Sequence, residues 1–393
     1  MKTASAVIGA GYGDEGKGLM TDYFARFLAD VVVRTNGGAQ AGHTVALPDG
    51  RRHVFHHVAS GALAGVPSHL GSRFVSNPMF LVPELGALAG FGAETSISAD
   101  PRGYVTTPYD VMVNQIVEEA RGGSRHGSCG MGFGETIERN EEGGPRLTVG
   151  DLYSGSHEVA ATLRSIRTDW VRGRLDRLGM PNVSEEWEHL LSSGEVEARF
   201  IEDCIAFCDA VRLLRDADVP SRVLFEGAQG LMLDMDYGHF PHVTRSNTGL
   251  LNMAAFAREA GIAKIDAVYA TRIYATRHGA GPLEHEEVSL EGVVKADSTN
   301  VHNSWQGLQR VAPLDVSLVA AAVRYDLARA DGVTVDASLA LTCIDQADGA
   351  FTVVDDGAPT LTDADLLANA LERTSGCRVA FRSTGPTAAD VLD

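Results

Sequence analysis

A glycine-rich loop near the start of the chain constrains the fold more than any other feature of the sequence. An apolar run at residues 5–8 leads into Gly9-Ala10-Gly11-Tyr12-Gly13-Asp14-Glu15-Gly16-Lys17-Gly18, and residues 19–28 then place apolar side chains at helical spacing. A buried strand that turns through glycines into a helix directs backbone N–H groups and the positive end of the helix dipole at one point, where a phosphate can bind. The loop therefore predicts an α/β fold with a phosphate site.

Two common phosphate-binding patterns fit this loop incompletely. Gly11, Gly13 and Gly16 have the spacing of a dinucleotide fingerprint, but the two acidic residues after Gly13 would repel a pyrophosphate. Gly11 and Gly16-Lys17 have the spacing of a P-loop, but Gly18 lacks the hydroxyl that such a loop offers to magnesium. An ordinary turn between a strand and a helix explains the glycines, but it does not explain Asp-Glu-Gly-Lys together.

A third interpretation takes the acidic residues of the loop as functional. A carboxylate beside a phosphate-binding lysine can hold Mg²⁺, and it can also accept a proton from a substrate. We therefore expect Asp14 to fill one or both of these roles beside Lys17.

The rest of the chain alternates between strand-like and helix-like segments. Apolar runs predict strands at residues 31–33, 222–225, 267–270 and 339–342, and helical spacing predicts helices at residues 185–216, with a break near 192–194, and at 313–330. Residues 141–145 and 355–359 are typical of surface turns. We expect an α/β fold with a mostly parallel central sheet flanked by helices. We also expect residues 1–393 to form a single domain with helical insertions or subdomains.

Composition and charge exclude several classes of protein. The chain has 393 residues, a formal net charge of −19 and no apolar stretch long enough to span a membrane, so we expect neither a membrane partner nor a nucleic-acid partner. Its five cysteines are scattered, without a disulfide framework or zinc spacing, and Cys204 and Cys208 read as core thiols on one helix face. The first residues lack a signal-peptide pattern, so we expect a cytoplasmic protein.

Motifs along most of the chain resemble those of the adenylosuccinate synthetase family, in the family's order. The loop Gly13-Asp14-Glu15-Gly16-Lys17-Gly18 resembles its first signature. The later matches are Asn36-Gly37-Gly38-Ala39-Gln40-Ala41-Gly42-His43-Thr44-Val45, Gly127-Ser128-Cys129-Gly130-Met131-Gly132, Val149-Gly150-Asp151-Leu152, Phe225-Glu226-Gly227-Ala228-Gln229-Gly230, Pro241-His242-Val243-Thr244, Thr276-Arg277-His278-Gly279-Ala280-Gly281-Pro282, Leu341-Thr342-Cys343-Ile344-Asp345 and Ser383-Thr384-Gly385-Pro386.

The resemblance implies a role for each matching residue. The implied catalytic residues are Asp14 as the base at purine N1, His43 as the general acid and Lys17 as the neutraliser of phosphate charge. The implied contacts to the GTP phosphates are Gly13, Glu15, Gly16, Gly18, Gly42 and Thr44. The implied contacts to the substrate nucleotide are Gln40, Ser128, Cys129, Gln229 and Thr244. The implied aspartate and sugar loop contains Thr299, Asn300, Val301, Trp305, Gln306 and Arg310. The implied guanine site of GTP is Asp345, Ser383 and Gly385, and Mg²⁺ would be held by Asp14 and the Gly42 carbonyl.

These roles imply a GTP- and Mg²⁺-dependent ligase with small-molecule partners. It would phosphorylate the 6-oxygen of a purine monophosphate, and the amine of L-aspartate would then displace the phosphate. This order is chemically reasonable, because a 6-oxo group leaves poorly and its phosphoryl ester leaves well. GTP is expected rather than ATP because a buried Asp345 carboxylate would pair with guanine N1–H and the 2-amino group.

Three departures from the family pattern bear on the substrate and the assembly. Gln40 stands where we expect asparagine. The arginine cluster expected after the loop at 127–132 is reduced to Arg139 and Arg146. This second departure weakens the expectation of a homodimer, which we nevertheless keep. The arginine-rich aspartate loop is replaced by residues 300–310, which resemble the bacteriophage branch of the family that makes the precursor of 2-aminoadenine.

The replaced loop favours dGMP as the substrate. If the enzyme is phage-encoded, the expected cytoplasm is that of the host. Asp14 points the other way, because members of that branch often carry serine there, and the retained acid is typical of the IMP-using enzyme. The alternatives are an ordinary adenylosuccinate synthetase that uses IMP, a GTP-binding switch or hydrolase, and an inactive homologue that only binds. Retention of Asp14, Lys17 and His43 argues against the last.

Overall fold

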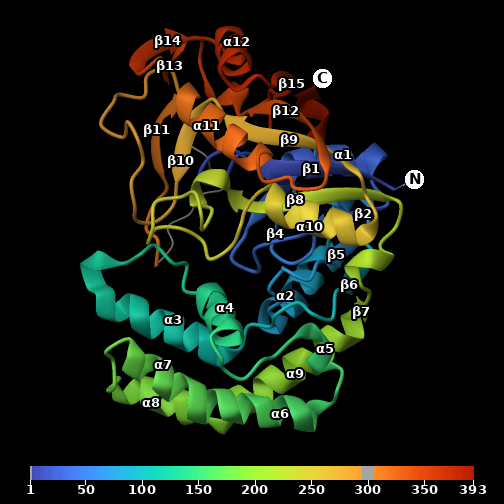
Figure 1. Cartoon of the computed structure of the whole chain (residues 1–393), viewed down its shortest axis with the longest axis vertical. Helices are drawn as coiled ribbons and strands as arrows, with labels where there is room; N and C mark the ends of the chain where they lie inside the picture. Colours follow the sequence, from blue (N-terminus) through green and yellow to red (C-terminus); the bar gives the residue numbers. More distant parts are fainter. Residues whose placement is uncertain (1, 294–304) are drawn as a thin grey trace.

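The computed structural model of the chain describes residues 2–293 and 305–393, and its centre is a ten-stranded sheet (Figure 1). The strand order is β16-β15-β12-β9-β1-β8-β2-β5-β6-β7, and every neighbouring pair that the structure describes in this sheet is parallel except β15 and β16. The strands are β1 (Thr3–Gly9), β2 (Val31–Arg34), β5 (Ser68–Leu70), β6 (Ile97–Ala99), β7 (Val211–Leu213), β8 (Arg222–Gly230), β9 (Lys264–Arg272), β12 (Thr334–Thr342), β15 (Arg378–Ser383) and β16 (Val391–Leu392). The predicted α/β fold with a mostly parallel sheet is confirmed.

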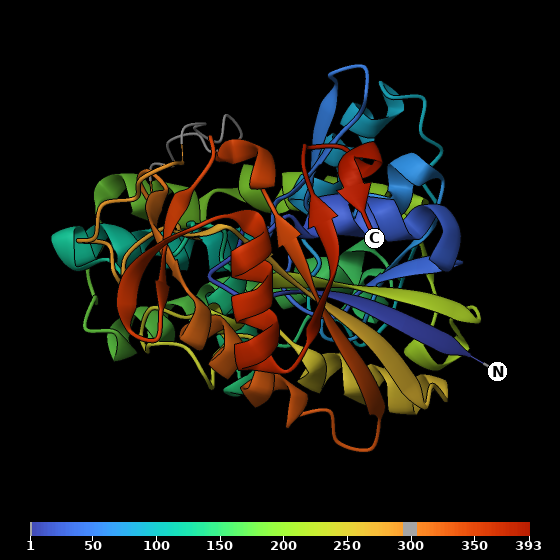
Figure 2. The ribbon, with the colours of Figure 1, turned by 90° about the horizontal axis from the view of Figure 1, so that it is seen from above.

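Burial on both faces explains why the central strands are continuous apolar runs. In β1, Ala6 and Ile8 lie in the largest core, whereas Val7 lies in a separate core on the opposite face. Helix α10 covers the first face and α1 covers the second, as Figure 2 shows on the two sides of the fanned strands. Because the strands are parallel, the loops at their carboxyl ends meet at one edge of the sheet, where ligands of such folds bind.

Twelve α-helices lie in the described part of the chain. They are α1 (Lys17–Leu28), α2 (Pro78–Ala89), α3 (Pro108–Arg121), α4 (Phe133–Glu141), α5 (Val149–Leu152), α6 (Ser156–Ser165), α7 (Arg172–Arg177), α8 (Glu185–Ser192), α9 (Gly194–Ala210), α10 (Leu250–Ala260), α11 (Val316–Leu327) and α12 (Ala364–Ser375). Helices α3 to α9 are inserted between β6 and β7 and gather on one side of the molecule, in the lower part of Figure 1. They contribute Tyr109, Trp170, Phe200 and Phe207 to a second core, which they share with strands such as β5 and β6 and with α2. The division of the chain into domains stays a prediction.

Two smaller sheets carry residues of the site. A four-stranded sheet has the order β10-β11-β13-β14, and a two-stranded sheet pairs β3 with β4. Their strands are β10 (Tyr274–Arg277), β11 (Arg310–Asp315), β13 (Phe351–Asp355), β14 (Ala358–Thr362), β3 (His43–Ala46) and β4 (Arg52–Phe55).

The structure corrects two predicted helices. The segment at 185–216 breaks at Ser193 as expected, but the helix ends at Ala210, because buried Val211 starts an edge strand that pairs with β6. The segment at 313–330 becomes helical only at Val316: residues 313–315 belong to β11, and the Asp315 carboxylate accepts hydrogen bonds from Ser317 N at 2.8 Å and Leu318 N at 3.1 Å, which starts the helix. The turn predicted at 355–359 joins β13 to β14.

The other structural expectations can be compared directly. Cys204 is buried and Cys208 is half-buried, and no cysteine of the described residues forms a disulfide. No helix within residues 2–293 and 305–393 is long and apolar enough to cross a membrane.

Candidate active site

The glycine loop is shaped by a buried carboxylate within it. Glu15 is only 3% exposed, and its Oε1 accepts hydrogen bonds from Gly11 N at 3.0 Å and Gly13 N at 2.7 Å, while Oε2 pairs with Lys17 Nζ. A side chain at Gly9 would collide with this carboxylate, since its Cβ would lie 2.3 Å from Glu15 Oε2. Glu15 therefore occupies two loop N–H groups that a phosphate would otherwise use.

Close packing explains why position 18 is glycine. A Cβ on Gly18 would lie 2.6 Å from the Thr44 carbonyl oxygen, so only glycine lets α1 approach β3 this closely. Thr44 directly follows His43, the first residue of β3. Glycine at position 18 therefore lacks the P-loop hydroxyl but allows β3 to pack against α1. This packing places His43, the first residue of β3, next to the glycine loop.

His43 forms a buried pair with a carboxylate that the sequence analysis left without a role. Its Nδ1 lies 2.6 Å from Glu226 Oε1, and Ser60 N donates to Glu226 Oε2 at 3.0 Å. Nε2 of His43 has no hydrogen bond to any described residue. On the strand next to Glu226, Arg34 is fully buried, and its guanidinium nitrogens have no hydrogen-bond partner among residues 2–293 and 305–393.

Burial and charge set the protonation of this pair. Burial lowers the pKa of His43 to about 4, with Arg34 and Lys17 acting in the same direction and Glu226 opposing them. Burial acts against the ionised form of Glu226, but Arg34 and His43 lower the pKa of its carboxyl to about 2. Glu226 is therefore an anion that only accepts, so neutral His43 carries its proton on Nδ1 and directs a lone pair from Nε2.

Asp14 lies in the glycine loop before Lys17, and one of its carboxylate oxygens has no hydrogen bond to the described residues. Its side chain is 28% exposed, and Oδ2 accepts hydrogen bonds from His278 Nε2 at 2.8 Å and Gln309 Nε2 at 2.7 Å. Burial opposes ionisation of Asp14, but the hydrogen bond and charge of His278, with the charges of Arg272 and Lys17, lower the pKa of its carboxyl to about 2. Oδ1 remains available to a ligand.

The predicted substrate loop and the replaced loop lie against each other. Ser128 Oγ donates to Asn114 Oδ1 at 2.9 Å, and Gln306 Nε2 donates to the Gly127 carbonyl at 2.8 Å. The Trp305 indole lies so close to Gly130 that a Cβ there would be 2.7 Å from Nε1. Trp305 and Gln306 therefore support the loop that carries Ser128 and Cys129.

Arg310 binds the protein itself through both ends of its guanidinium. It donates to the carbonyl oxygens of Gly279 at 2.9 Å and Gly281 at 2.7 Å, and to Glu286 Oε2 at 2.8 Å. It holds the loop at residues 279–281, which contacts Gly127. In this arrangement Arg310 holds a loop next to the predicted substrate loop in place through contacts to the protein itself.

A side-chain amide joins two other predicted contacts. Asn36 Nδ2 donates to the Ala228 carbonyl and Asn36 Oδ1 accepts from Ala228 N, both at 3.0 Å, so the segments of Gln40 and Gln229 are tied together. Gln40 Nε2 is buried without a hydrogen-bond partner in the described part of the chain, which is the state expected of a donor that faces an anion. Thr244 is half-buried in the loop after β8.

The predicted guanine contacts lie at the carboxyl ends of two neighbouring strands. Asp345 follows β12, and Ser383 ends β15, whose residues pair with β12. Ser383 Oγ donates to the Gly385 carbonyl at 2.7 Å, and Thr342 Oγ1 donates to the Glu15 carbonyl at 3.0 Å, which joins β12 to the glycine loop. Thr299, Asn300 and Val301 lie outside the described residues.

Sequence reasoning missed the partners of the proposed catalytic groups. Glu226, His278 and Gln309 lie within quoted motifs or the replaced loop, but no local signal shows that they meet His43 or Asp14, which are 183, 264 and 295 residues away.

Known proteins that resemble this chain agree with its motifs. The family model described as adenylosuccinate synthetase matches residues 6–353. The adenylosuccinate synthetase of Clostridium perfringens is 34% identical over 291 residues, which are 72% of this chain and 65% of that protein; the Acaryochloris marina protein is 35% identical, covering 72% and 63%. The chain thus spans slightly less than two thirds of these relatives. The Clostridium botulinum Eklund 17B protein is 32% identical over 353 residues, covering 87% and 78%.

Two solved structures share the fold at 18% sequence identity. A fully ligated adenylosuccinate synthetase from Plasmodium falciparum superposes with a TM-score of 0.73, covering 100% of this chain and 99% of that one. The succinoaminodeoxyadenylate synthetase of cyanophage S-2L, bound to dGMP and to dATP as an energy donor, superposes with a TM-score of 0.62, covering 100% and 95%. From its motifs and from the matching family model, the chain belongs to the adenylosuccinate synthetase family.

Proposed function

We propose that the protein is a GTP- and Mg²⁺-dependent ligase that joins L-aspartate to C6 of a purine nucleoside monophosphate. The observation that carries the proposal is the pair of open atoms beside one lysine. Asp14 offers an ionised Oδ1, His43 offers Nε2, and the charge of Lys17 acts on both side chains. A GTP-binding switch has no use for a second acceptor site of this kind.

Asp14 would make the 6-oxygen nucleophilic. The lowered pKa of Asp14 keeps its carboxylate ionised at neutral pH, so Oδ1 can accept a hydrogen bond from N1–H and take that proton as the 6-oxygen is phosphorylated. The 6-oxygen then forms a bond to the γ-phosphorus as the bond from that phosphorus to the bridging oxygen breaks and the diphosphate leaves. The aspartate amine next bonds to C6 and loses a proton to solvent, the C6–oxygen bond breaks, and inorganic phosphate departs.

His43 would change its protonation when the phosphate donor binds. In the described arrangement it is neutral, because burial, Arg34 and Lys17 disfavour the imidazolium. A bound triphosphate brings negative charge to the Nε2 side, which opposes Arg34 and Lys17 and raises the pKa of His43. The imidazolium can then donate from Nε2 to the leaving diphosphate oxygen, while Glu226 holds Nδ1.

The residues fit a magnesium ion shared with phosphates. Mg²⁺ usually takes one or two carboxylates and completes its shell with phosphate oxygens and water, and it would neutralise phosphate charge here. Asp14 Oδ1 has more than one lone pair, so it could bind Mg²⁺ as well as the N1–H group of a purine, and exposed Gly42, next to His43, offers a carbonyl. No group of three or more His, Cys, Asp or Glu side chains that could hold a metal occurs in the described ranges, so an all-protein cage is not formed there.

We propose dGMP as the preferred acceptor. The support is the replaced loop, where Trp305 and Gln306 contact the substrate loop in place of arginines, and the shared fold with a cyanophage enzyme described as bound to dGMP. The second candidate is IMP, because the curated relatives are adenylosuccinate synthetases and Asp14 is retained.

We propose GTP as the phosphate donor. Its support is Asp345, which follows β12 beside the glycine loop, because a carboxylate pairs with guanine N1–H and the 2-amino group. The competing donor is an adenine nucleotide, as in the cyanophage structure with dATP. The homodimer and the cytoplasmic location stay predictions.

One assay tests these proposals together. Purified protein is incubated with aspartate and Mg²⁺, with dGMP or IMP as acceptor and GTP, ATP or dATP as donor, and products are identified by mass. The expected result is a succinylated product from dGMP with GTP, and no phosphate release without acceptor and aspartate. Phosphate release that ignores both would establish a hydrolase instead, and product from IMP alone would establish the ordinary synthetase.

A further inference from the structure

We propose that Gln309 recognises the 2-amino group of a guanine substrate, and that Gln309 and His278 together form a clamp that turns Asp14 toward purine N1. This inference rests on the proposed function, because it assumes that Asp14 meets N1. It goes further by naming the side chain that separates purines with a 2-amino group from those without one.

The clamp is built at the end of one pair of strands. β10 and β11 are antiparallel, and their last paired residues are Arg277 and Arg310. His278 is the next residue after Arg277, and Gln309 is the residue just before Arg310, so the two lie opposite each other where the ladder ends. Both donate to Asp14 Oδ2, at 2.8 and 2.7 Å.

Two donors on one oxygen determine which oxygen meets the substrate. Because both donors bind one oxygen of the Asp14 carboxylate, Oδ2, the other oxygen, Oδ1, is left for a ligand. The side chains of Asp14 and His278 are each 28% exposed, which leaves room for a ligand at this edge. The clamp therefore presents a single fixed acceptor to a purine.

The hydrogen bond to Asp14 also fixes the orientation of the Gln309 amide. Gln309 Nε2 lies 2.7 Å from Asp14 Oδ2, so the NH₂ group of the amide is turned toward the carboxylate. Its Oε1 then points away from Oδ2, and it has no hydrogen-bond partner in residues 2–293 and 305–393. The result is a free acceptor beside the proposed base.

Guanine offers the matching pair of donors on one edge. Its N1–H and 2-amino group are neighbours, so N1–H can meet Asp14 Oδ1 while the 2-amino group meets Gln309 Oε1. Hypoxanthine has a C–H at position 2, which would shield Gln309 Oε1 from water without donating a hydrogen bond to it. A site built to bind a polar group rejects an analogue that lacks it, because the buried partner is left unpaired.

The experiment uses dGMP and dIMP, which differ only in the 2-amino group. Kd for each nucleotide, measured by calorimetry, and kcat/KM, at saturating GTP and aspartate, are determined for the wild type, Gln309→Leu, Gln309→Met and His278→Asn. The wild type is expected to favour dGMP roughly tenfold to hundredfold, and both Gln309 variants are expected to lose that preference. His278→Asn is the matched control: it weakens the clamp but keeps Gln309 Oε1, so it should lower kcat/KM for both nucleotides by a similar factor and retain the preference.

The outcomes separate this inference from the proposed function. If Gln309→Leu and Gln309→Met lower binding and turnover of dGMP and dIMP equally, Gln309 only positions Asp14 and the recognition role is wrong. If no nucleotide yields a succinylated product, the proposed function fails, while the dGMP-to-dIMP ratio of Kd values still decides whether Gln309 reads the 2-amino group.

Discussion

Among the buried histidine–carboxylate pairs of the described residues, His43–Glu226 and His69–Asp216 differ in how one ring nitrogen is bonded. In His43–Glu226, Nδ1 binds the carboxylate and Nε2 has no partner within the described residues. In His69–Asp216, Nε2 lies 2.8 Å from Asp216 Oδ1 and Nδ1 lies 2.9 Å from Ser98 Oγ, so both nitrogens are bonded. The second pair has the residue types of a catalytic triad, but its imidazole is fully buried and completely satisfied.

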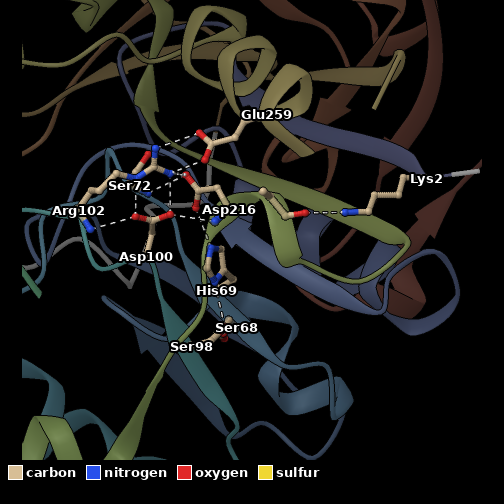
Figure 3. A network of polar contacts seen from close by, with 10 residues as sticks. Lys2, Ser68, His69, Ser72, Ser98, Asp100, Arg102, Asp216 and Glu259 are labelled. Carbon is tan, nitrogen blue, oxygen red and sulfur yellow. Dashed lines mark hydrogen bonds and ion pairs between the residues drawn. The ribbon is translucent and has the colours of Figure 1, made fainter. Parts of the chain in front are cut away.

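The surroundings of the two pairs reinforce this difference. Figure 3 shows the Asp216 carboxylate within a wider network, where Asp216 N donates to Asp100 Oδ2 at 2.8 Å and Arg102 bridges Asp100 to Glu259. Beside Glu226, by contrast, the Arg34 guanidinium is buried without a hydrogen bond to the described chain. A closed network of this kind stabilises the fold, whereas the unsatisfied groups around His43 mark a place where a ligand must complete the hydrogen bonding.

Replacing His43 should give the largest effect. His43→Asn can still donate to Glu226 but removes Nε2, and Asp14→Ala removes the proposed base. Each should lower turnover roughly a hundredfold to ten-thousandfold. Steady-state kinetics measure the loss, and thermal melting checks that each variant still unfolds in one cooperative transition. Activity within about threefold of the wild type would reject the assignment.

Replacing His69 should have the opposite pattern. His69→Leu removes the imidazole that bonds Asp216 Oδ1 and Ser98 Oγ and leaves that buried carboxylate oxygen unpaired, which should cost about 2–4 kcal/mol of unfolding free energy. Activity per folded molecule should stay within about threefold, because no nitrogen of His69 is open. Urea denaturation and active-site-normalised kinetics are the measurements. A stable but inactive variant would show that the network has a catalytic role.

Acidification should weaken the fold partly through His43. Its pKa is about 4 in the folded protein and about 6.5 when unfolded, so the unfolded state binds the proton more readily. Stability from this group is present above pH 6.5 and falls as the pH drops from about 6.5 to about 4. His43→Asn should therefore lose roughly 1–3 kcal/mol less than the wild type over that range. Parallel denaturation curves for the two proteins would contradict the assigned shift.

The smallest effect is expected from Arg34. Its charge lowers the pKa of His43, so Arg34→Met should raise that pKa from about 4 toward the ordinary value of 6.5. Titration of the His43 ring by NMR measures the change, with Arg51→Met, a surface arginine paired with Asp49, as the control. An unchanged His43 titration would show that Arg34 does not act on the pair.

Much of the fold was readable from local patterns. The strands β1, β2, β8 and β9 are buried on both faces, so their apolar runs are visible in the sequence alone. The bounds of two predicted helices were wrong because strand pairing with distant segments overrides the local spacing of apolar residues. Residues 211–213 continue a helical pattern but form β7, because β6 offers them a partner, and residues 313–315 join β11 for the same reason.

The order of the motifs is visible in the amino-acid sequence, as are the glycine loop and the candidate residues Asp14, Lys17 and His43. These signals are local, because a loop that must bring N–H groups to a phosphate needs glycines and charges within a few residues. The partners that surround these residues follow only from how distant segments pack together. Parallel pairing of β2 with β8 sets Arg34 beside Glu226, and the end of the β10–β11 ladder brings His278 and Gln309 to Asp14. Such contacts depend on strand register between distant segments, and no spacing within a motif records that register.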